Sequence, residues 1–152
     1  MLPINYKALN TSPPVAIIDN ASASTTEIDT QGFDYCIVFC WLGATDIAMT
    51  SLQCTESDTA GSGHSAVTGL VYGTSSSITG STSSLPAADE DNGIFAFEID
   101  LLGRKRYLDV TATCGNGDAG TFVTVNAILL RAQDAPDANS ATERGLTGCL
   151  RV

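Results

Sequence analysis

"FDYCIVFCWL" (33–42) gives the strongest strand signal in this chain. Alternate residues of an extended strand face opposite sides. One side then carries Phe33, Tyr35, Ile37, Phe39 and Trp41, and the other carries Cys36, Val38, Cys40 and Leu42. Because both sets are apolar, the pattern predicts a central strand that is covered on both faces.

Weaker patterns predict strands on either side of it. In 94–101, Phe95, Phe97 and Ile99 alternate with small or acidic residues, which is the pattern of a half-buried strand. Segment 47–56 also fits a helix, but its neighbourhood of β-branched and aromatic residues favours a strand. The connection "LGRK" (102–105) predicts a tight hairpin. The remaining predicted strands are 15–19, 25–29, 66–73, 106–114 and 121–132.

Seven or eight strands, spaced by turn residues and with no convincing helix, predict an all-β fold. The expected architecture is an antiparallel β-sandwich, with a jelly roll as one form of it. The sandwich domain is predicted over 15–132. The Pro-containing segment 1–14 and the polar segment 133–152 are predicted as N- and C-terminal arms, and the Ser-, Gly- and Thr-rich segment 57–92 as long surface loops.

Charge limits the classes of partner. The chain has 152 residues, a net charge of −10 and a pI near 4.1, so broad binding to nucleic acid or to an anionic membrane is not expected. No signal peptide and no apolar run long enough to span a bilayer is visible, which predicts synthesis in a reducing cytosol.

Five cysteines, an odd number, argue against a disulfide framework in such a chain. Cys36 and Cys40 lie four residues apart on one strand, about 13 Å between Cα atoms, which is too far to bridge. A cross-strand pair such as Cys36 with Cys54 remains open. Small, buried, reduced thiols are the preferred interpretation.

Catalytic and metal-binding patterns are weak. His64, in "GSGHSA" (61–66), has no second histidine or serine elbow beside it, so a solvated loop residue is preferred over a catalytic base. The "ADEDNG" loop (88–93) lacks the spaced carboxylates of a calcium loop, and a solvated acidic turn is preferred. No cofactor and no metal site is predicted, and the chain is not expected to be an enzyme.

Two further surface possibilities come from the strands. Glu98 and Asp100 share a face, as a glycosidase pair would, but a solvated face is the simpler expectation. Trp41 and Tyr35 suit stacking on a sugar, but on a strand that is apolar on both faces we expect them in the core.

"GRKRY" (103–107) gathers three of the seven basic side chains of an acidic protein. In one interpretation these side chains point to water or pair with Asp100 and Asp109 across the strands. In the other, Arg104, Lys105, Arg106 and Tyr107 form a docking patch that orients the protein on an acidic partner. The sequence favours neither.

The segments 25–59 and 94–132, and most specifically "IDLLGRKRYLDVTATCGNG" (99–117), resemble small β-rich proteins encoded among the head genes of tailed bacteriophages. The resemblance covers about residues 15–132. It implies a capsid decoration, or cement, protein that binds the outside of the phage head.

Such a protein is implied to be a homotrimer that contacts the major capsid protein, to use no cofactor and to catalyse nothing. It would be made in the host cytoplasm and end on the exterior of the virion. Extended arms would suit the gripping of neighbouring subunits. A receptor- or carbohydrate-binding β-sandwich module of a virion is the alternative, with the 57–92 loops as its recognition surface.

Overall fold

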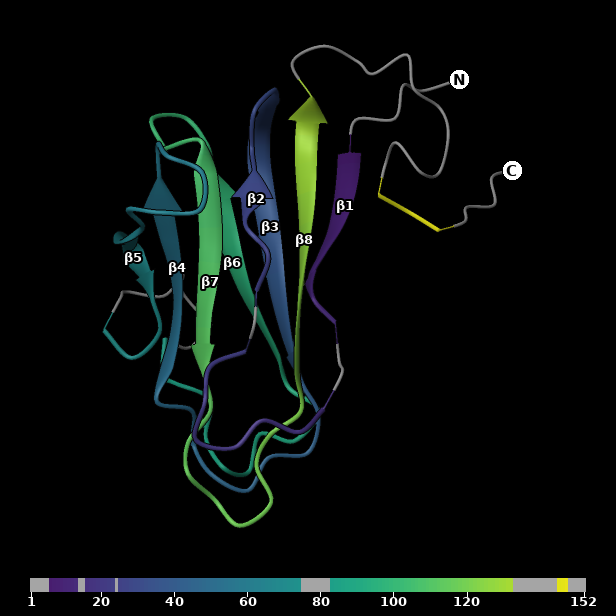
Figure 1. The fold of residues 1–152 in the computed structure, drawn as a ribbon, viewed down its shortest axis with the longest axis vertical. Helices are drawn as coiled ribbons and strands as arrows, with labels where there is room; N and C mark the ends of the chain where they lie inside the picture. The colour runs from purple at the N-terminus through teal and green to yellow at the C-terminus, as the bar shows by residue number, and fades with distance from the viewer. Residues whose placement is uncertain (1–5, 14–15, 24, 75–82, 133–144, 148–152) are drawn as a thin grey trace.

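The computed structural model describes residues 6–13, 16–23, 25–74, 83–132 and 145–147. Within these ranges the protein is all-β, and no helix is long and apolar enough to cross a membrane. Its strands, drawn in Figure 1, are β1 (Tyr6–Ser12), β2 (Ile28–Asp29), β3 (Phe33–Leu42), β4 (Ser51–Ser57), β5 (Ser65–Val71), β6 (Ile94–Asp100), β7 (Tyr107–Thr113) and β8 (Val123–Ala132). The predicted all-β fold is therefore confirmed.

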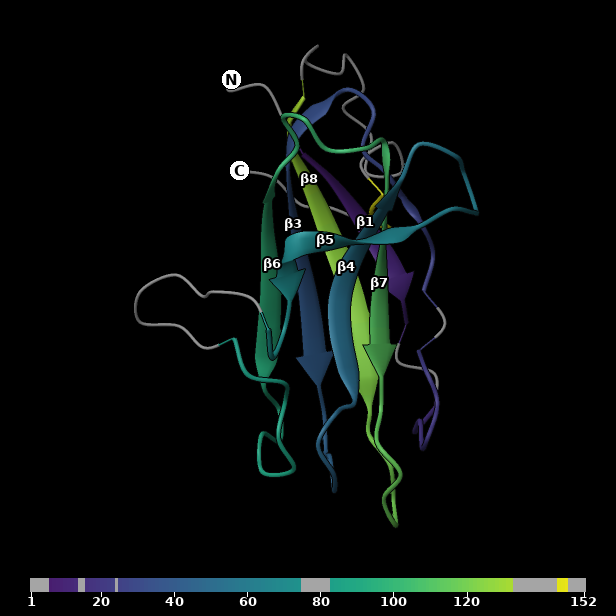
Figure 2. The same cartoon turned by 90° about the vertical axis from the view of Figure 1, so that its left-hand side faces the viewer.

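Two antiparallel four-stranded sheets pack face to face, with strand orders β1-β8-β3-β6 and β2-β7-β4-β5. Figure 2 shows the second sheet in front of the first. The antiparallel pairs are nested, because β1 pairs with β8, β2 with β7, β3 with β6 and β4 with β5. Of the seven connections, β4–β5 alone joins neighbours in one sheet, and the others cross between the sheets.

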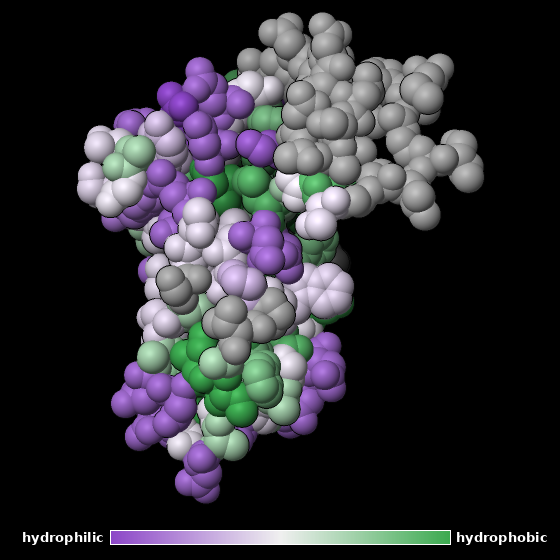
Figure 3. All heavy atoms as spheres, turned by 45° about the vertical axis from the view of Figure 1, so that its right-hand side comes forward, coloured by the Kyte–Doolittle hydropathy of each residue, from purple (hydrophilic) through white to green (hydrophobic). Residues whose placement is uncertain are grey.

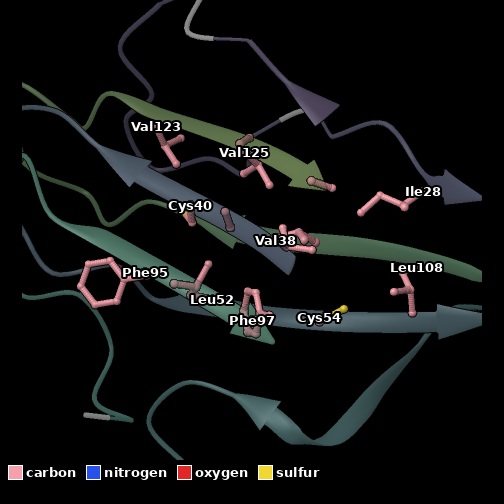
Figure 4. Packing of buried hydrophobic residues seen from close by; sticks show 14 of the residues in the cluster. Ile28, Val38, Cys40, Leu52, Cys54, Phe95, Phe97, Leu108, Val123 and Val125 are labelled. Carbon is pink, nitrogen blue, oxygen red and sulfur yellow. The ribbon is translucent and has the colours of Figure 1, made fainter. Parts of the chain in front are cut away.

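The core lies between the sheets and is built by alternation along each strand. The inward residues of β3, which include Val38 and Cys40, face those of β4 and β7, which include Leu52 and Leu108 (Figure 4). All of these side chains are buried. Fully burying a side chain of this size contributes roughly 1.5–3 kcal/mol, so the burial of this layer stabilises the fold substantially.

The other face of β3 differs from the prediction. Tyr35, Ile37 and Phe39 are half-buried and Trp41 is exposed, so the expectation that β3 is covered on both faces, with Trp41 and Tyr35 in the core, is wrong for the described residues. A two-layer sandwich covers one face of each sheet. A strand that is apolar on both faces needs either a third layer to cover it or an apolar face that stays exposed. In the described chain, the outer face of β3 stays partly exposed.

Strand boundaries near the N-terminus also differ from the prediction. Tyr6–Ser12, expected as part of an irregular arm, forms β1 and pairs with β8. Residues 16–19 make one isolated bridge, Ile18 with Thr121, and the predicted strand 25–29 shortens to β2. The Pro residues that suggested an arm lie outside β1. The predicted C-terminal arm falls outside the described residues except for 145–147.

The predicted hairpin at 102–105 is wrong. β6 pairs with β3 in one sheet and β7 pairs with β4 and β2 in the other, so residues 101–106 cross from sheet to sheet. Facing sheets lie about 10 Å apart, a gap that six residues span easily. The local sequence predicts a turn at 102–105, but which strands β6 and β7 pair with depends on how the whole core packs.

Tyr72, just after β5, caps the outer edge of β6. Its hydroxyl donates to the Ala96 carbonyl at 2.8 Å and accepts from the Ala96 amide at 3.2 Å. Its ring makes edge-on contacts with Phe95 and Phe97, at centroid distances of 5.6 and 5.3 Å. An edge strand with unpaired amides invites pairing with other chains, and Tyr72 satisfies two such groups of β6.

Four cysteines, Cys36, Cys40, Cys54 and Cys114, are free and buried between the sheets, as predicted. Burial raises the pKa of Cys36, Cys40 and Cys54 to about 12. These thiols act as compact apolar side chains. Cys149 lies outside the described residues.

We predict that the four core thiols are unreactive in the native protein. Cys36, Cys40 and Cys54, whose pKa is about 12, are only ~10⁻⁴ ionised at pH 8. Burial also raises the pKa of Cys114. A Cys149→Ser variant should therefore release no colour with a disulfide reagent at pH 8 until urea is added, and then four equivalents. Rapid labelling of any core cysteine without denaturant would contradict the burial.

Tyr72→Phe should destabilise the protein by about 1 kcal/mol, because the amide and carbonyl of Ala96 lose their shared partner. Urea unfolding followed by circular dichroism measures the change. Tyr35→Phe, on the outer face of β3, is the matched control. An equal effect of the two substitutions would show that the hydroxyl of Tyr72 has no special role.

Candidate functional site

The basic turn at 103–107 is held by ion pairs within the molecule. Arg106 donates to both carboxylate oxygens of Asp29, from Nε at 2.9 Å and from Nη2 at 2.7 Å. Its guanidinium also lies 4.9 Å from the ring centroid of Tyr107. The Arg106 hydrogen bonds hold the pKa of Asp29 below its ordinary value and raise that of Arg106.

Arg104 and Lys105 both lie beside Glu56. Arg104 Nη1 is 3.7 Å from Glu56 Oε1, and the backbone amide of Lys105 donates to Glu56 Oε2 at 3.2 Å. The arginines thus pair with Asp29 and Glu56, and not with Asp100 and Asp109, because the turn crosses between sheets. Lys105 forms no ion pair within the described part of the chain. Binding of a partner by Arg104, Lys105, Arg106 and Tyr107 remains a prediction.

His64 is not the solvated loop residue that was predicted. It is half-buried, and its Nε2 lies 2.7 Å from Glu27 Oε2. The Gly61 amide donates to the same oxygen at 2.9 Å. The pair therefore ties the β4–β5 turn to the segment before β2, which is a structural role.

Three of the carboxylates considered for catalysis or calcium, Asp100, Glu90 and Asp91, accept hydrogen bonds from backbone amides of loops. Glu98 and Asp100 are exposed on β6, as expected, and Asp100 accepts from the Leu102 amide at 2.9 Å. In the 88–93 loop, Glu90 accepts from Ala87 and Asp91 from Thr45. No group of three or more His, Cys, Asp or Glu residues suited to a metal occurs among the described residues.

The structure brings together an exposed apolar set that the sequence did not predict as a site. Ile17, Trp41, Ile94 and Phe122 are 48, 45, 55 and 41% exposed. We call these four residues the apolar patch. Figure 3 shows apolar surface gathered at the lower end of the molecule, the loop end of Figure 1, with hydrophilic residues on both sides of it. The signal in the sequence was the second apolar face of 33–42.

Comparison with known proteins gives no relative for this chain. No family model matches it, and neither a curated protein nor a solved structure does.

The Asp29–Arg106 pair predicts a pH-dependent contribution to stability. The folded pKa of Asp29 is lowered, so its contribution is present above the unfolded value of about 4 and is lost as pH falls through the folded value. Asp29→Asn keeps an acceptor oxygen but removes the charge. Its Tm should lie below that of the wild type at pH 7 and converge with it toward pH 2.

Asp58→Asn, an exposed carboxylate at the start of the β4–β5 turn, is the control and should follow the wild type across the pH range. If the gap between Asp29→Asn and the wild type stays constant with pH, the charge of Asp29 does not stabilise the fold.

Proposed function

We propose that this protein is a non-catalytic structural component of a virion, a capsid decoration protein that binds the outside of a phage head and stabilises it. The observation that carries the proposal is an exposed aromatic and aliphatic surface on a rigid sheet: Trp41 and Ile94 are direct neighbours across β3 and β6. Exposed apolar patches rimmed by polar residues mark sites of protein interaction.

The fold supports this proposal by analogy. Nested pairing of β1 with β8 through β4 with β5 is the pattern expected of a jelly roll, an architecture that recurs in viral capsid and lectin domains. Fold alone does not imply function. The major capsid protein as partner, the homotrimer and the position on the head exterior stay proposals that need direct measurement.

Mixing the purified protein with undecorated, expanded phage heads tests the proposal. We expect saturable binding with a fixed number of copies per head and an increase in the temperature at which heads break. Sedimentation gives the stoichiometry, and the mass in solution tests the trimer. Absence of binding to such heads would end the proposal.

Lys105→Ala tests the basic turn in the same assay. Because Lys105 has no ion pair within the described chain, we expect roughly 3- to 10-fold weaker binding to heads. Lys105→Arg, which keeps a positive charge at this position, is the control and should bind as the wild type does. If both variants bind as the wild type does, the basic turn at 103–107 does not contact the shell, and its ion pairs only stabilise the fold.

A second candidate, a carbohydrate-binding module of a virion, is favoured by the exposure of Trp41, since sugars stack on exposed indole rings. A glycan array, followed by titration of any hit against Trp41→Ala, tests it. Saturable binding that depends on Trp41, without binding to heads, would select this candidate over the first.

A further inference from the structure

Basic side chains gather at one end of the sandwich. Because β1 and β3 run antiparallel to β8, and β3 to β6, the first residues of β1 and β3 lie at the same end as the last residues of β6 and β8. The basic residues of the described chain all lie at or near this end, in β1, β8 and the 101–106 connection: Lys7, Arg104, Lys105, Arg106 and Arg131.

The opposite end is acidic. Its loops, 16–23, 43–50, 83–93 and 114–122, carry Asp19, Asp46, Asp89, Glu90, Asp91 and Asp118, and none of their residues is Lys or Arg. Asp46 accepts from the amides of Ala119 and Gly120, which lowers its pKa. The Asp46 carboxylate is therefore ionised at neutral pH.

The apolar patch lies at this acidic end. Trp41 is next to the end of β3, Ile94 begins β6, and Phe122 precedes β8. The isolated bridge between Ile18 and Thr121 is antiparallel, so their neighbours Ile17 and Phe122 lie opposite each other and point to the outside.

The patch is held rigidly. The Trp41 ring meets Phe39 edge-on at a centroid distance of 6.3 Å. Phe122 lies over Gly43, where a Cβ would come within 2.9 Å of the Phe122 Cβ, and the Gly43 amide donates to the Phe122 carbonyl at 2.9 Å. A pre-organised aromatic surface loses little entropy on binding, and Trp is enriched among the residues that dominate binding energy.

We propose that the apolar patch is a docking surface for a second protein whose complementary surface carries Lys or Arg around exposed apolar side chains. Apolar contacts at Trp41, Ile94 and Phe122 supply affinity, and the surrounding carboxylates select and orient a basic partner. The inference concerns the opposite end from the basic turn and holds for a phage shell or for any other protein partner.

A second copy of this chain is a poor occupant. A two-fold contact through the patch would bring two acidic loop sets together, and like charges across an interface disfavour association. A head-to-tail contact would need the basic end as partner. That end also carries Asp34 and Asp100, and its Arg104 and Arg106 already pair with Glu56 and Asp29, which leaves Lys105 with little net positive charge around it. Charge complementarity therefore points to a different, basic surface.

Fluorescence of Trp41, the single tryptophan, reports directly on the patch. The probe is a soluble 14-residue synthetic peptide of leucine and lysine, compared with a leucine–glutamate peptide and a serine–lysine peptide of the same length. We expect a saturable blue shift with the leucine–lysine peptide alone, weakening as salt is raised.

Two variants, one of the patch and one of the acidic loops around it, should each weaken this binding on the order of 10-fold. Ile94→Thr removes apolar surface from a strand while keeping a β-branched residue, and its control is Leu102→Thr, 89% exposed at the basic end. Asp89→Asn combined with Asp118→Asn removes charge at the acidic end, with Asp58→Asn combined with Glu98→Gln as its control. The controls should bind as the wild type does.

Three results would overturn the proposal. Equal binding of the serine–lysine peptide would show that charge alone attracts the peptide. Equal binding of the leucine–glutamate peptide would show that the carboxylates do not select a basic partner. A blue shift of Trp41 that grows with protein concentration without peptide, together with a dimer in sedimentation, would assign the patch to a second copy.

Discussion

Period-two alternation in β3 is the constraint on which the rest of the structure depends. β3 pairs with β8 on one side and β6 on the other, so its register fixes which residues of three strands face inward. A slip by one residue would exchange Cys36, Val38, Cys40 and Leu42 for Tyr35, Ile37, Phe39 and Trp41 in the core. The facing sheet matches the smaller set, since its own inward residues Leu52, Leu108 and Val110 fill the space between the layers.

The local alternation of apolar residues was enough to predict four of the strands. β3, β6, β7 and β8 lie close to their predicted bounds, because each carries several alternating apolar residues. β1 was missed and β2 was predicted too long, because strands at the edges of sheets are stabilised by their partners and hardly by their own residues. The crossing at 101–106 could not be predicted either, since a short turn fits a hairpin and a sheet-to-sheet connection equally well.

The candidate sites were less predictable than the fold. Sequence identified the basic turn but not its partners, because Asp29 and Glu56 come from strands far away in the chain. His64 and Glu27 are 37 residues apart, and only the folded β4–β5 turn brings them together. The exposure of Trp41 was missed for a different reason: apolar alternation predicts which residues share a face, while the presence of a covering layer depends on how many sheets the domain contains.

Stability and the proposed partner binding depend on different parts of the molecule, namely the two faces of β3 and the two ends of the sandwich. The inner face of β3 supplies stability through a buried layer of thiols and aliphatic side chains, while its outer face is only partly buried. Its apolar residues are then retained at a cost in solubility, which the high negative charge offsets. That charge is distributed unevenly: the paired arginines stabilise one end, and carboxylates that have no ion pair within the described chain surround the apolar patch at the other. A surface that is apolar in the centre and acidic at the rim repels acidic proteins and anionic membranes, and the proposed selectivity for a basic protein surface rests on this repulsion before any shape complementarity is considered.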